Sequence, residues 1–201
     1  MSTGIDIKYV EEAYRRMTND ELIRIATQDA SGLTPEAMEV VKAEIKKRGL
    51  DENISKGVEA QNKAYTVEEV DTYCDLVSKL SCPYCGGTAE RLNATMTGEV
   101  MSFIFFTQYN KKLKVACPHC LDKANNNALT KTVLLGWWGI PWGIIKTVQS
   151  ISLNLKSKKT NHLHDHNDYL RSFALNTIGE LETYKDNKEM LKQIVARKNG
   201  L

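Results

Sequence analysis

Two pairs of cysteines carry the clearest chemistry in this chain of 201 residues. Each pair has the spacing Cys-x-x-Cys: Cys82 and Cys85 lie in the segment CPYCGG, and Cys117 and Cys120 lie in CPHC. A tight turn with this spacing presents both sulfurs to the same side, so two such turns can surround one metal ion with four thiolates. Gly86 gives the first turn the backbone freedom that it needs. The four cysteines are therefore the predicted metal ligands.

Four sulfur ligands complete a tetrahedral shell and leave no position for water or a substrate, which is typical of structural zinc. Zinc is the expected ion. Iron in an electron carrier of the rubredoxin type, or a redox-active dithiol, are alternatives that the spacing leaves open. His119 lies inside the second pair and is expected to point outward, because the four sulfurs already complete the shell.

The two cysteine motifs resemble the knuckles of zinc-ribbon proteins, which often read CPxCG. The second pair departs from this pattern, because Leu121 stands where a glycine is common. The ribbon motifs followed by GWWGIPWG make residues 80–155 look like segments of uncharacterised bacterial zinc-ribbon proteins. This resemblance implies that the ribbon and the following segment form one structural unit, and it implies no activity.

The thirty-one residues between the two pairs are expected to form the sheet of the ribbon. They are rich in strand formers around FIFF, and the segments TGE and YNKK are typical of turns. Strands are therefore expected near residues 88–96, 99–109 and 112–117. Upstream, residues 67–80 carry apolar side chains at helical spacing, with Cys74 as a buried member of that face.

The expected fold class is α+β, with a small antiparallel zinc-ribbon sheet flanked by N-terminal and C-terminal helical modules. A capping box from Thr18 to Glu21 and the Thr34-Pro35 start indicate two short N-terminal helices. Polar and apolar composition then sets the module boundaries. These are 1–50 (helical hairpin), 51–66 (linker), 67–121 (helix plus ribbon), 122–155 (Trp-rich, apolar and basic segment), 156–168 (polar linker) and 169–201 (C-terminal helices).

The Trp-rich segment holds all three tryptophans, Trp137, Trp138 and Trp142, in fourteen uncharged residues between Lys131 and Lys146. As one helix it would span about 21 Å, short of a hydrocarbon core of ~30 Å, and its proline and glycines disfavour a regular helix. Three interpretations remain open: an apolar cover packed on the ribbon, a docking surface for a protein, and a membrane contact anchored by indole and ammonium groups.

Residues 111–160 contain nine lysines and a single acid, a field that attracts phosphates, anionic lipid or an acidic protein face. Lys111, Lys112 and Lys114 are the candidates for nucleic-acid binding. The N-terminus has no basic region followed by an apolar one, so no signal peptide is expected. A cytoplasmic location is expected, with attachment to the membrane periphery as an alternative.

Three histidines and an aspartate, His162, His164, Asp165 and His166, look like a hydrolase metal motif that is one residue too short. We expect a polar linker there, and no other catalytic pattern emerges. The expected function is a non-enzymatic zinc-ribbon adaptor that binds a protein partner, for example a toxin that it restrains. Nucleic-acid binding and peripheral membrane attachment are the alternatives, and the oligomeric state stays open.

Overall fold

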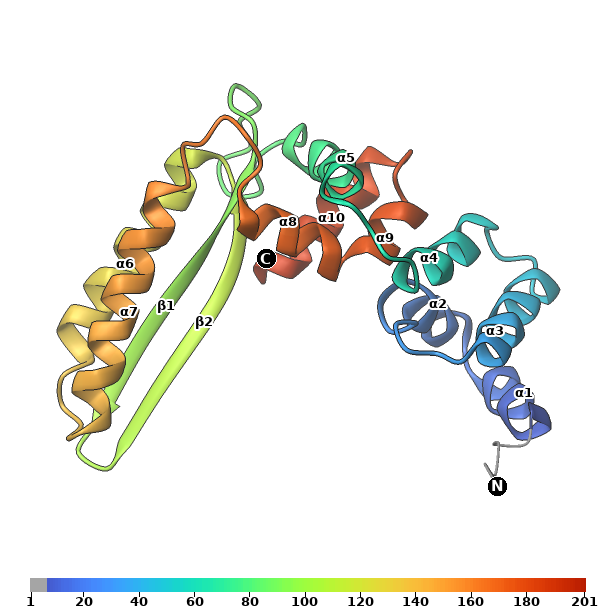
Figure 1. Cartoon of the computed structure of the whole chain (residues 1–201), viewed down its shortest axis with the longest axis horizontal. Coiled ribbons are helices and arrows are strands. Elements are labelled where there is room, and N and C mark those ends of the chain that lie inside the picture. Colours follow the sequence, from blue (N-terminus) through green and yellow to red (C-terminus); the bar gives the residue numbers. More distant parts are fainter. Residues whose placement is uncertain (1–6) are drawn as a thin grey trace. The chain divides into compact units, whose positions relative to one another are not determined.

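The structure, a computed structural model, describes residues 7–201, which form ten helices and one two-stranded antiparallel sheet (Figure 1). The expected α+β class is confirmed, with helices on both sides of the sheet. The helices and strands are α1 (Ile7–Arg16), α2 (Asn19–Gln28), α3 (Pro35–Lys47), α4 (Asn53–Gln61), α5 (Val67–Ser78), β1 (Asn93–Phe103), β2 (Phe106–Ala116), α6 (Pro118–Leu135), α7 (Trp142–Lys159), α8 (Asp168–Asn176), α9 (Ile178–Thr183) and α10 (Lys188–Asn199).

The chain divides into two compact units. The first unit contains Met1–Tyr73 and Leu175–Lys188, and the second contains Cys74–Ala174 and Glu189–Leu201. The unit boundaries thus differ from the six consecutive modules expected from composition, because each unit is assembled from segments far apart in the sequence.

The capping signals read in the first unit are confirmed. The N–H of Thr18 donates to Glu21 Oε2 (2.8 Å), and the N–H of Glu21 donates back to Thr18 Oγ1 (3.3 Å). Thr34 accepts a hydrogen bond from Ala37 N–H, and Pro35 occupies the first turn of α3. These contacts fix the start of α2 and α3 locally, since each involves residues only three positions apart.

Helix α4 occupies residues for which the sequence predicted a linker, 51–66. Its Ile54 and Val58 are buried in the core of the first unit. Gly57 allows α4 to approach α9 closely, because a Cβ at this position would lie 2.9 Å from the carbonyl oxygen of Gly179. The partner helix is more than a hundred residues away in the chain, so no local pattern could reveal this packing.

The second unit contains one long hairpin instead of three shorter strands. Asn93 pairs with Ala116 at one end and Phe103 with Phe106 at the other, with a turn at 104–105. The predicted turns TGE and YNKK lie inside the strands, where Gly98 pairs with Lys111.

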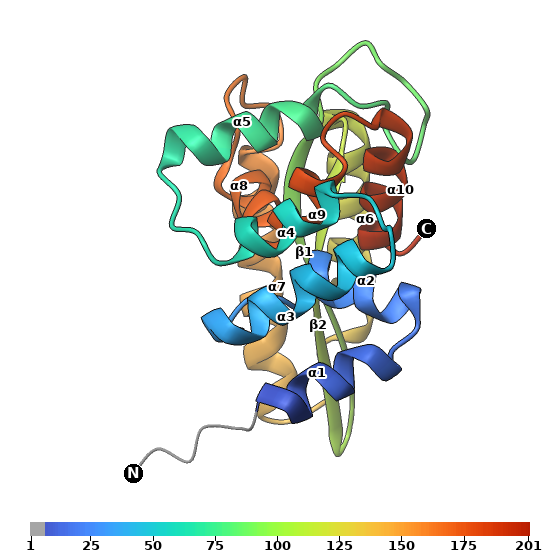
Figure 2. The same cartoon turned by 90° about the vertical axis from the view of Figure 1, so that its right-hand side faces the viewer.

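We call β1, β2, α6 and α7 together the arm. Helices α6 and α7 run along β1 and are joined by residues 136–141 (Figures 1 and 2). Much of the Trp-rich segment is therefore helical, and α7 continues to Lys159, well into the predicted linker 156–168. The expected C-terminal module contains three helices, α8 to α10.

Candidate metal centre and apolar tip

The fold brings the sulfurs of Cys82, Cys85, Cys117 and Cys120 within 4.8 Å of one another. The Sγ atoms of Cys85 and Cys117 are 3.7 Å apart, and all four cysteines are free thiols. Two sulfurs on a tetrahedral zinc ion, each bonded at about 2.3 Å, lie about 3.8 Å apart, whereas a disulfide requires about 2.05 Å. The cluster could therefore hold a metal ion.

The first knuckle is closed by backbone hydrogen bonds. Cys82 N–H donates to the carbonyl of Gly87 (2.8 Å), and Gly86 N–H donates to the carbonyl of Cys82 (2.8 Å). Gly86 has a φ of +72°, the left-handed conformation that favours glycine. The N–H of Cys117 points at the Cys82 sulfur (3.5 Å), which links the two knuckles directly.

The second knuckle is the start of a helix. Cys117 occupies the N-cap of α6, Pro118 follows at the first helical position, and Cys120 lies in the first turn. Leu121 is fully buried, which explains the departure from the ribbon pattern: the chain continues as a helix and needs no glycine turn. The positive end of the helix dipole also favours thiolates at this position.

The protonation of the cluster depends on its surroundings. Burial raises the pKa of Cys82, but the backbone N–H groups of Cys117, Cys85 and Tyr84 outweigh it and bring this pKa down to about 7. Burial raises the pKa of Cys117 and of Cys120, and the neighbouring sulfurs raise that of Cys120 further. Four thiolates at this distance require a cation, and a divalent metal ion supplies the charge.

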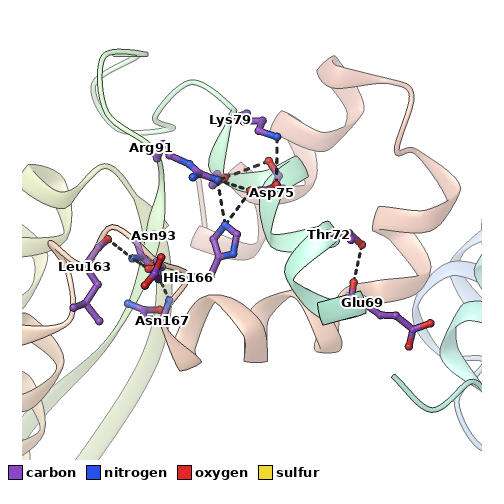
Figure 3. Close-up of polar contacts among 11 residues, drawn as sticks. Glu69, Thr72, Asp75, Lys79, Arg91, Asn93, Leu163, His166 and Asn167 are labelled. Carbon is purple, nitrogen blue, oxygen red and sulfur yellow. Dashed lines mark hydrogen bonds and ion pairs between the residues drawn. The ribbon is translucent and has the colours of Figure 1, made fainter. Parts of the chain in front are cut away.

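The histidine-rich segment does not converge on a single site. His162 contacts Asp122 (2.9 Å). His166 instead contacts Asp75 (3.2 Å) and the guanidinium of Arg91 (3.3 Å), as Figure 3 shows. Burial raises the pKa of Asp75, but the hydrogen bond from Lys79 and the nearby positive charges outweigh it, so this pKa lies below its usual value.

Buried polar side chains cover the free edge of β1. The carbonyl of Gly98 accepts hydrogen bonds from Ser150 Oγ and Asn154 Nδ2 (both 2.7 Å), and its N–H donates to Asn154 Oδ1 (3.3 Å). Val100 N–H donates to Thr132 Oγ1 (3.1 Å), and the carbonyl of Met96 accepts from Asn125 Nδ2 (3.3 Å). Side chains of α6 and α7 thus replace a third strand.

These side chains recur at regular steps along both helices, and we call them the polar seam. The buried residues of α7 are Gly143, Thr147, Ser150, Asn154 and Ser157, at alternating steps of four and three. Helix α6 contributes Asn125 and Thr132 among its buried residues. Sequence reasoning missed the seam because it searched for apolar periodicity, although small and polar residues with this heptad spacing were visible.

The far end of the arm, which we call the tip, comprises residues 100–108 and 132–145 and contains no charged residue. Its aromatic side chains face outward: Trp137, Trp138 and Trp142 are 42%, 67% and 62% exposed. The glycines face inward instead. A Cβ on Gly139 would lie 2.1 Å from Ser102 Oγ, so this residue must be small for the connection to close on the hairpin.

This orientation corrects the interpretation of the tryptophans as an apolar cover for the ribbon. Trp138 does border a hollow of about 490 Å³ together with Phe103, Phe105, Phe106 and Leu135, but large parts of these side chains remain exposed. The glycines make the close contacts with the hairpin, and the indoles lie at the surface.

Lysines border the tip on several elements. Lys131 pairs with Glu99 (3.2 Å), and the ammonium groups of Lys111 and Lys146 lie 5.2 and 5.8 Å from the ring centre of Tyr109. Lys112 is exposed on β2. The ammonium of Lys114 instead lies 5.6 Å from the ring centre of Tyr84, between the two cysteines of the first knuckle.

No helix within residues 7–201 is long and apolar enough to cross a bilayer. Comparison of the chain with protein-family models, with curated proteins and with solved structures gives no match. What the chain itself shows is a cluster of four cysteines that is compatible with a zinc-ribbon-like metal site.

Proposed function

We propose that this chain is a non-catalytic zinc protein that docks to a partner through the tip of its arm. The observation that carries this proposal is the tip itself, in which twenty-three residues without a charge expose three tryptophans and three phenylalanines of the hairpin turn region. Exposed apolar patches of this kind mark interaction sites, because a soluble surface otherwise avoids them.

The metal centre has a structural task in this proposal. The first knuckle lies a few residues before β1 and the second follows β2 directly, so one ion would tie together both strands and the start of α6. A closed shell of four sulfurs suits zinc in such a role and offers no open position to a substrate. The ion would hold the base of the arm while the polar seam keeps the arm rigid along its length.

Photo-crosslinking in the native host tests docking. A photoreactive amino acid replaces Ile140, which is 82% exposed in the tip, and in a control it replaces the exposed Lys123 on the same arm outside the tip. We expect adducts from position 140 and none from position 123. Absence of any adduct from the tip, with protein or with lipid, in a protein that retains its metal, would refute the proposed function.

A further inference from the structure

The arm has the opposite polarity to that of a helical hairpin built for water. Its buried residues on α7 are all small or polar, whereas Ile144, Ile145, Val148 and Leu155 of the same helix are exposed. In a water-soluble hairpin, the apolar face of each helix packs inward and the polar face is solvated. Packing α7 onto β1 therefore removes little apolar area of this helix from water. The apolar side chains of the helix stay exposed.

The interior of the arm meets the demands of an apolar surrounding. The outward-facing backbone groups of β1 at Gly98 and Val100 are bonded by Asn154, Ser150 and Thr132. In lipid, backbone groups must find their partners within the protein, and small residues at helix contacts let the helices approach closely. Within the tip, Thr132 satisfies Val100, and Gly139 and Gly143 allow the close approach to the hairpin.

Lys111 and Lys146 lie at a similar distance from the end of the tip. Gly98 and Tyr109 lie beside the cations: Lys111 pairs with Gly98 in the sheet, and Lys146 reaches the ring of Tyr109. From Tyr109 to the turn residue Phe105 the strand advances four residues, about 13 Å. One leaflet contributes about half of the ~30 Å hydrocarbon core, so the uncharged tip is long enough to enter one leaflet.

Resting on the docking function proposed above, we propose that the partner is an anionic lipid bilayer, and that the tip inserts into one leaflet. The indoles of Trp138 and Trp142, which lie beside the turn residue Phe105, then enter the leaflet with the tip, and Lys111 and Lys146 face the lipid phosphates. The hollow beside Trp138 is lined by apolar side chains, which suits an acyl chain. The length of the tip limits insertion to one side of the bilayer.

The distribution of exposed side chains favours lipid over a protein surface or a second copy of the chain. Apolar residues are exposed on the hairpin turn, on the end of α6 and on the start of α7: Phe105 is 100% exposed, Leu134 64% and Trp142 62%. A flat protein partner covers one face and leaves the others in water. A fluid bilayer surrounds a protruding tip on all sides.

The tryptophans supply a direct measurement, because all three of the chain lie in the tip. The zinc-loaded full chain is mixed with phosphatidylcholine vesicles that contain about 30% phosphatidylserine, and with vesicles of phosphatidylcholine alone. We expect a blue shift of the tryptophan emission and quenching by lipids brominated in the acyl chain, because the indoles enter the leaflet with the tip. Binding should weaken as salt is raised, because the lysine contribution is screened.

Two sets of variants test the parts of the tip. Phe105→Ser with Ile140→Ser should weaken the partition coefficient on the order of a hundredfold, because two large apolar side chains no longer enter the lipid. Leu163→Ser removes a half-exposed apolar side chain outside the tip and should have no effect. Lys111→Gln with Lys146→Gln should weaken binding about tenfold on the anionic vesicles alone.

The outcomes separate this inference from the proposed function. Vesicles that leave the tryptophan emission unchanged, or binding that the tip variants and Leu163→Ser weaken equally, would overturn lipid insertion. If crosslinking from position 140 then identifies a protein, docking through the tip stands and the lipid partner is rejected. If neither vesicles nor crosslinking detects a partner, both proposals fail. Retained zinc and an unchanged circular dichroism spectrum establish that each variant is folded.

Discussion

Replacing Asn154 by alanine removes the centre of the polar seam. Asn154 is fully buried and bonds both the N–H and the carbonyl of Gly98. Each of these hydrogen bonds contributes about 1 kcal/mol, and a buried N–H that loses its acceptor costs about 1–3 kcal/mol. The carbonyl of Gly98 keeps Ser150 as a donor, so we expect a total loss of about 2–4 kcal/mol.

Two measurements report this loss. For a chain of this size it corresponds to a fall in melting temperature of about 10 °C. Hydrogen exchange resolved by residue should show faster exchange at the Gly98 amide, because local opening of the arm becomes easier. Asn127→Ala on α6 is the matched control, since Asn127 is exposed on the same arm, and it should leave both measurements unchanged.

Leucine at position 154 gives the sharper refutation. It has the same number of side-chain heavy atoms as asparagine, branched at the same carbon, and it adds apolar area. It would therefore stabilise the arm if the polar side chains of the seam had no structural role. We expect Asn154→Leu to destabilise the arm as well, because the N–H of Gly98 still loses its acceptor. An Asn154→Leu variant as stable as the parent would show that the seam does not serve the edge of β1.

The remaining predictions concern the metal centre, the tip and one ion pair. Elemental analysis should find about one zinc per chain, and Cys82→Ser should lose the metal and several kcal/mol of stability; a folded, metal-free parent would contradict this. Gly143→Ala should cost about 1–3 kcal/mol in urea unfolding, although alanine favours helices, because its Cβ would lie 2.9 Å from the Gly136 carbonyl. Asp75→Asn should lower the free energy of unfolding by less than about 1 kcal/mol near pH 5, since the ion pairs of Asp75 are partly exposed. The folded pKa of Asp75 is below its unfolded value, so its contribution is present above the unfolded pKa and should shrink as the pH falls through the unfolded pKa toward the lower folded one; a difference that grows on acidification would contradict this.

The sequence by itself was sufficient where the interacting groups are close in the chain. The caps at Thr18 and Thr34 act over three residues, and the spacing within each cysteine pair shapes its own turn. Two such pairs predict a shared ion because few other arrangements satisfy four thiols. The assignment of TGE as a turn was wrong because Gly98 lies within a strand, where the absence of a side chain lets α7 pack closely. A Cβ at this position would lie 3.1 Å from Ser150 Oγ.

Only the tertiary structure decided the orientation of the Trp-rich segment. Its composition is equally compatible with a buried core, a protein interface or a lipid contact, because composition does not show which side of a helix faces the chain. The free edge of β1 determines which side of each helix faces the chain. Its N–H and carbonyl groups need polar partners, so Thr132, Ser150 and Asn154 turn inward. The apolar residues of the same helices and the three tryptophans are thereby left on the outside.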